Sequence, residues 1–199
     1  MTEVLIVGAG PVGVMLAAEL ARRGVDAGVI EAREDRSAGT RAVGVHSAAL
    51  TALEPSGATE RLLETARRVR TGIALAGGRR LGTVRFDRLQ SRHPYVATLP
   101  QHATEAALTA TAASWGAPEV RRGNSVRRVS PEGASVSVEF VDRDGRSMSE
   151  HAPIVVIAAG SRGRAVSPLT AAVRTHQYPD RYLMTDAPDT SRDGDAAVV

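Results

Sequence analysis

The N-terminal stretch Val4-Leu-Ile-Val-Gly8-Ala-Gly10-Pro-Val-Gly13 decides the fold of this chain. Its first four residues are continuously apolar, which is typical of a strand buried in a parallel sheet. A helix is expected over 11–23, because apolar residues recur there at helical spacing. The residues expected on its inner face are Val12, Leu16, Ala17 and Leu20. A second strand follows over 26–31, so the first 31 residues predict a βαβ unit.

Each glycine of the turn has a separate physical task. Gly8 permits a tight turn, Gly10 lets the backbone approach a pyrophosphate, and Gly13 lets the helix pack closely on the strand. The free N–H groups of the helix start face the phosphates. Glu31 ends the second strand, 18 residues beyond Gly13 and close to the expected spacing of about 20. A carboxylate at this position accepts hydrogen bonds from ribose hydroxyls. The alternative is a tight turn in an α/β domain without a nucleotide, but the whole unit favours a dinucleotide site.

Composition excludes several kinds of chemistry. The chain has 199 residues, enough for one domain or a domain with part of another. It has no cysteine, which excludes disulfides, thiolate catalysis and cysteine-based metal sites, and no metal site is expected. All 25 cationic residues are arginine, which excludes a lysine Schiff base. The net charge of +3 is no nucleic-acid footprint.

The sequence also indicates a location. Met1 leads directly into the first strand, so no signal peptide is expected. No apolar run approaches the roughly 20 residues of a membrane span. We therefore expect a cytoplasmic protein without a membrane partner.

The rest of the chain alternates between helical and strand patterns. Gly77-Gly78 is expected to turn a hairpin, and a meander of antiparallel strands should run from 125 to 151. The apolar run 154–159 is placed in the same sheet as Val4–Val7. Further helices are expected over 46–53, 58–66 and 101–115, and further strands over 72–76, 80–86, 95–99, 181–185 and 196–199.

An arginine-rich stretch covers residues 61–92, with nine arginines against Glu64 and Asp87. A phosphate-binding patch is one interpretation. A solvated surface is favoured, because the arginines do not alternate with aromatic residues; Phe86 is the one aromatic residue of the stretch.

Four segments in order resemble the FAD-binding part of the single-component flavoprotein monooxygenases with a para-hydroxybenzoate hydroxylase-type fold. The first is the βαβ unit. The others are Arg41-Ala-Val-Gly-Val-His46, expected as a loop followed by a helix, Leu99-Pro-Gln101-His-Ala-Thr-Glu105, and Ile154-Val-Val-Ile-Ala-Ala159-Gly160. The resemblance implies an α/β fold, with a Rossmann-like FAD-binding domain, an antiparallel meander and part of a β-rich substrate domain. The implied domains are 1–71 with 101–165 for FAD and 72–100 with 166–199 for the substrate.

The resemblance also implies a cofactor and its contacts. FAD is the expected cofactor, NAD(P)H the reductant, and a small aromatic or polyketide-like molecule the substrate to be hydroxylated with O2. Arg41 and Gln101 would contact the pyrophosphate or ribityl region. The full set of implied cofactor-binding residues is Gly8, Gly10, Pro11, Val12, Gly13, Glu31, Ala32, Arg33, Arg41, Gln101, Val126, Ala159 and Gly160. No catalytic side chain is assigned; His46 is expected as a capping or surface residue.

Two departures from the family pattern leave alternatives open. The family has Asp-Gly where this chain has Ala159-Gly160, and alanine offers no side-chain acceptor. The later Gly-Asp motif of the family is not present. The alternatives are a flavoprotein-fold enzyme without redox turnover, acting as a cyclase, hydrolase or rearrangement enzyme, and a non-catalytic FAD-binding subunit. The latter would join a partner chain or a second copy through the C-terminal strand.

Overall fold

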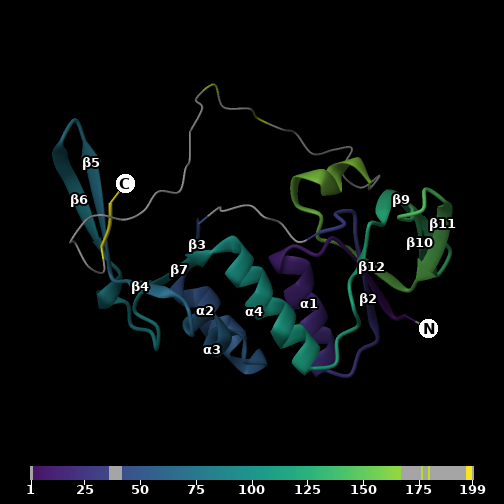
Figure 1. The fold of residues 1–199 in the computed structure, drawn as a ribbon, viewed down its shortest axis with the longest axis horizontal. Helices are drawn as coiled ribbons and strands as arrows, with labels where there is room; N and C mark the ends of the chain where they lie inside the picture. Colours follow the sequence, from purple (N-terminus) through teal and green to yellow (C-terminus); the bar gives the residue numbers. More distant parts are fainter. Residues whose placement is uncertain (1, 36–41, 167–175, 177–178, 180–195, 199) are drawn as a thin grey trace. The chain divides into compact units, whose positions relative to one another are not determined.

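The computed structural model describes residues 2–35, 42–166, 176, 179 and 196–198 (Figure 1). The chain divides into two compact units, residues 1–37 with 108–182 and residues 38–107 with 183–199. Both units are mixtures of strands and helices, which confirms the expected α/β class. The limits of these units differ from the predicted domain limits, which stay a prediction.

A four-stranded parallel sheet organises the first unit. Its order is β12 (Ile154–Ile157), β1 (Val4–Val7), β2 (Ala27–Glu31) and β8 (Arg121–Arg122). In this sheet Val4 pairs with Ala27 on one side and with Ile154 on the other. The prediction that the second apolar run joins the first strand is therefore confirmed.

The two faces of this sheet are covered differently. Helix α1 (Pro11–Arg22) covers one face, where a Cβ built on Gly13 would lie 3.4 Å from Ile6 Cγ2. The meander of β9 (Ser125–Glu132), β10 (Ser135–Val141) and β11 (Ser147–Ala152) covers the other face and confirms the predicted strands. The core on that side consists of Leu5, Val7, Ile30, Val129, Val138, Phe140 and Ala152.

Two expectations about burial are wrong. Val12 is 72% exposed, because helical spacing places it about 200° around the axis from Val14, which is buried together with Ala17 and Ala18. Ile154 is 55% exposed, because β12 is an edge strand with one neighbour, whereas the prediction had assumed a strand buried on both faces.

The second unit contains a three-stranded antiparallel sheet with short helices. The order is β3 (Ala42–Val45), β7 (Val96–Pro100) and β4 (Arg67–Val69). The expected loop before His46 is thus a strand, β3, paired with β7. Leu50, Tyr95 and Ala97 form the core. Both predicted helices are confirmed within a few residues, as α2 (Ser47–Leu53), with η1 (Glu54–Ser56) after it, and α3 (Ala58–Leu63).

A hairpin completes the second unit. Strands β5 (Thr71–Ala76) and β6 (Arg79–Arg85) turn at Gly77-Gly78 as predicted, and η2 (Phe86–Arg88) follows. Strand β13 (Ala196–Val198) pairs with β5 in parallel. The predicted strand 181–185 lies outside the described residues. The predicted helix 101–115 is α4 (Gln101–Ser114), and no helix among the described residues is long and apolar enough to cross a membrane.

Candidate cofactor site

The glycine-rich turn contains two glycines that the fold itself requires. Gly8 has φ +106°, and a Cβ there would lie 2.7 Å from the carbonyl oxygen of Ala158. A Cβ on Gly13 would collide with the carbonyl oxygen of Gly8. These contacts explain the tight turn and the close helix without reference to any ligand.

Gly10 has a different explanation. Its φ of −73° and ψ of 179° suit any residue, and a Cβ there would meet no atom of the described residues within 4 Å. The protein interior therefore does not require glycine at this position, whereas a phosphate approaching the backbone does. No side chain caps helix α1 at its start, where Pro11 occupies the first turn. Val12, in the same turn, is exposed. The residues present thus fit a pyrophosphate.

Glu31 stands at the carboxyl end of β2 with its side chain held in place. The backbone N–H of Ala9 donates to Oε2 at 2.7 Å, and the backbone N–H of Arg33 donates to Oε1 at 2.9 Å. The Arg33 guanidinium forms an ion pair with the same carboxylate at 3.1 Å. Burial raises the pKa of Glu31, but the hydrogen bonds from Arg33 and Ala9 outweigh it, so the pKa is lowered. The exposed Ala32 follows directly.

The second predicted motif lies against the first. The N–H of Ala158 donates to the carbonyl oxygen of Val7 at 2.7 Å, and a Cβ on Gly8 would lie 2.8 Å from Ala159 Cα. Ala159 is the N-cap of η3 (Gly160–Ala165), where no side chain caps the helix. The structure therefore brings Ala159 and Gly160 to the glycine-rich turn, with an uncapped helix start where the family has an aspartate.

The remaining predicted residues are placed elsewhere. Val126 pairs with Phe140 and packs against the core on the meander side. Gln101 begins α4 in the second unit, and its Nε2 donates to Glu105 Oε1 at 2.9 Å. The exposed His46 is the N-cap of α2, without a side-chain capping bond. Arg41 lies outside the described residues. The cofactor roles of Val126, Gln101 and Arg41 stay predictions.

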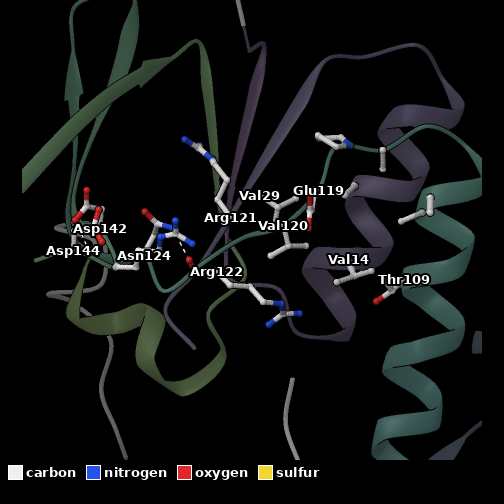
Figure 2. A pocket seen from close by; sticks show the side chains of 16 residues that line it. Val14, Val29, Thr109, Glu119, Val120, Arg121, Arg122, Asn124, Asp142 and Asp144 are labelled. Atoms are coloured by element: carbon white, nitrogen blue, oxygen red, sulfur yellow. Dashed lines mark hydrogen bonds between the residues drawn. The ribbon is translucent and has the colours of Figure 1, made fainter. Parts of the chain in front are cut away.

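Two residues at the end of β8 were not predicted from the sequence: Arg122, its last residue, and Asn124, two residues further on. Arg122 pairs in register with Glu31, and the N–H of Asn124 donates to the Glu31 carbonyl oxygen at 3.0 Å. Both residues line a pocket of about 740 Å³ (Figure 2). The pocket is bounded by Val14, Ala17, Val29, Thr109, Ala112, Ala113, Ala117, Pro118, Glu119, Val120, Arg121, Arg122, Asn124, Asp142, Arg143 and Asp144. A strand as short as β8 carries no periodic signal that could have revealed it.

Comparison with known proteins agrees with the geometry of the turn. A family model described as "FAD binding domain" matches residues 1–196, and the chain belongs to this family. Its cofactor is FAD, as the resemblance implied. The curated relatives include a rifampicin monooxygenase of Streptomyces venezuelae, which is 36% identical over 142 residues. An uncharacterized aromatic compound monooxygenase of Bacillus subtilis is 37% identical over 164 residues.

These alignments cover 71% and 81% of this chain but only 29% and 32% of the two relatives. The chain therefore spans about a third of the length of the curated relatives it matches. Among solved structures, an anhydrotetracycline hydroxylase from Streptomyces rimosus is 32% identical with a TM-score of 0.69, covering 79% of this chain and 31% of that one. A p-nitrophenol 4-monooxygenase from Pseudomonas putida, at 24% identity and a TM-score of 0.75, covers 81% and 42% and shows the same fold.

Proposed function

We propose that this chain is the FAD-binding part of a monooxygenase that hydroxylates aromatic or polyketide-like small molecules with NAD(P)H and O2. The observation that carries the proposal is Gly10, because packing against the described residues does not explain a glycine at this position. The relatives supply the reaction class, because they include monooxygenases of rifampicin, of anhydrotetracycline and of an aromatic compound.

The described residues have roles in binding rather than in bond-making. The backbone around Gly10 and the start of α1 would hold the pyrophosphate, and Glu31 would accept hydrogen bonds from the adenosine ribose. When bound, FAD supplies the redox chemistry, and the protein orients it and excludes water. The ionised state of Glu31 suits this role, because a carboxylate without its proton is an acceptor only.

A substitution at Gly10 tests the proposal. Gly10→Val should lower FAD affinity by about tenfold or more, because the side chain would occupy the space of the pyrophosphate. Gly82→Val is the matched control, since a Cβ there also meets no atom within 4 Å but lies on the β6 hairpin. The measurement is quenching of flavin fluorescence on titration of the apo-protein. Equal affinity of Gly10→Val and wild type would contradict the proposed site.

Ala159 favours a second candidate, a flavoprotein-fold enzyme without redox turnover. Its side chain leaves the start of η3 uncapped and offers no acceptor to a flavin. Such an enzyme would bind FAD yet fail to consume NAD(P)H. NAD(P)H oxidation above background by the FAD-loaded protein, with a panel of phenolic and polyketide-like substrates, supports the monooxygenase; its absence supports the second candidate.

A partner chain or second copy is a further part of the proposal. Strand β13 pairs with β5 on one side, and in the part of the chain that the structure describes no strand pairs with its other side. An open strand edge is a site of association. Sedimentation that gives only a monomer at high concentration would contradict association of copies through this edge.

A further inference from the structure

The two arginines of β8 face opposite sides of the parallel sheet. Arg121 pairs with Ile30, which belongs to the core on the meander side. Arg122 pairs with Glu31, whose carboxylate meets the glycine-rich turn on the side of α1. Because paired residues of adjacent strands point to the same face, Arg122 stands beside Glu31 on the α1 side.

The two guanidinium groups also differ in their partners. Arg121 Nη2 donates to Glu150 Oε2 at 2.8 Å, and its guanidinium lies 6.0 Å from the centre of the Phe140 ring. Arg122 Nη1 is buried without a hydrogen-bond partner among the described residues. Figure 2 shows the two side chains leaving the strand in different directions, with Arg122 extending toward the helix that carries Val14.

A buried donor without a partner calls for an explanation, because such groups are rare in folded proteins. Val29 lines the pocket two residues before Glu31 in β2, and Arg122 pairs with Glu31, so these three side chains share one face of the sheet. Glu31 and Arg122 therefore lie side by side at the carboxyl edge of the sheet, beyond Val29 on the α1 face. Dinucleotides bind at this edge in parallel sheets.

We propose that Arg122 is a cofactor-positioning residue that donates from Nη1 to a hydroxyl oxygen of the adenosine ribose. The inference rests on FAD as the cofactor. A ribose hydroxyl both donates and accepts, whereas the ionised Glu31 only accepts. Glu31 and Arg122 together supply both complements from adjacent strands. Cofactor binding would then satisfy the buried Arg122 Nη1 donor, which has no partner among the described residues.

This arrangement predicts opposite effects on stability and on binding. In the protein without cofactor, Arg122→Met removes a buried unpaired donor and keeps a side chain of similar length, so the melting temperature should rise by about 2 °C. FAD and ADP affinities should fall by about tenfold, as for loss of a charged hydrogen bond. Arg85→Met on β6 is the control: it also loses an ion pair, with Asp87, but should leave both affinities unchanged.

The ribose contact itself is tested with 2′,3′-dideoxy-ADP. Calorimetric titration should show that Arg122→Met lowers the affinity for ADP about tenfold. The affinity for dideoxy-ADP should fall less than about twofold, because this ligand lacks the acceptor hydroxyls. An equal fall in affinity for both ligands would overturn the proposal. A lower melting temperature of Arg122→Met together with a lower affinity would also overturn it. Arg122→Lys, which keeps the charge without the fork, should be intermediate for ADP and decides the matter if Arg122→Met fails to fold.

The same titrations separate this proposal from the proposed function. Wild-type chain that binds FAD, with an Arg122→Met variant of equal affinity, would overturn the role of Arg122 and leave the FAD site standing. Wild-type chain that binds neither FAD nor ADP would overturn both.

Discussion

Glu31 keeps its negative charge although it is only 8% exposed. Its two oxygens accept hydrogen bonds from Arg33 and from the Ala9 backbone. The carboxylate thereby ties the end of β2 to the glycine-rich turn before any ligand arrives. The same side chain that holds the turn is the one proposed to accept hydrogen bonds from the ribose.

The lowered pKa of Glu31 predicts a pH dependence of stability. The unfolded chain binds a proton at higher pH than the folded chain does, so the stabilisation is present above the ordinary glutamate pKa of about 4.3 and is lost as pH falls below it. The free energy of unfolding of the apo-protein should therefore fall more steeply from pH 6 to pH 3 in wild type than in Glu31→Gln. It is measured by chemical unfolding at each pH.

The exposed Glu34→Gln should follow wild type across the same range and serves as the control. Parallel curves for wild type and Glu31→Gln would show that the hydrogen bonds from Ala9 and Arg33 do not favour the ionised form. The unfolding free energy is the quantity to compare, since the melting temperature mixes several ionisations.

The tight turn at Gly8 and the close helix packing at Gly13 were predictable because each depends on glycine at a fixed spacing. The ribose contact of Glu31 stays a prediction. Arg122 lacks such a signal. Its importance comes from a register with Glu31 across 91 residues of chain, and from the burial of one nitrogen atom. Pairing between strands so distant in sequence is a tertiary property, which no local pattern records.

At the scale of elements, the strong periodic segments were predictable and the short ones were not. The βαβ unit and the meander carry repeated apolar patterns, and both are confirmed. Strand β3 (Ala42–Val45) was expected as a loop. It is a strand because it pairs with β7, which lies far away in the sequence. Val12 was assigned to the wrong face of α1, because small residues such as Ala17 and Ala18 form the inner face there.

The uncapped start of η3 offers a prediction at this scale. Ala159→Asp should raise the unfolding free energy by about 0.5–1 kcal/mol, because its carboxylate can accept from the first N–H groups of the helix. Ala159→Asn should stabilise by a similar amount, since asparagine is an equally good cap. The measurement is urea unfolding of the apo-protein.

The pair of variants also separates capping from flavin chemistry. If the family aspartate serves NAD(P)H use, flavin reduction followed under anaerobic conditions should become faster in Ala159→Asp than in Ala159→Asn. Equal stability of both variants and wild type would contradict the capping argument. Equal reduction rates would remove Ala159 as a reason for the candidate without redox turnover.

At the scale of the molecule, apolar surface gathers on the β5–β6 hairpin. Leu81 is 69% exposed, Val84 is 58% exposed and Leu75 is 43% exposed. Every residue of β6 is exposed, and its outer edge pairs with no strand in the part of the chain that the structure describes. Exposed apolar residues along an open edge are typical of a surface that another chain or segment covers.

Self-association through this hairpin is therefore expected of the isolated chain. The double variant Leu81→Ser, Val84→Thr should lower the fraction of dimers and larger species in sedimentation velocity, because it removes apolar area while keeping the strand. Its FAD affinity should equal that of wild type, since both residues are exposed on the hairpin and neither is a proposed FAD contact. Met148→Ser, which removes an exposed side chain from β11, is the control and should leave association unchanged. If association is unchanged in the double variant but lower in Met148→Ser, the meander and not the hairpin is the surface of self-association.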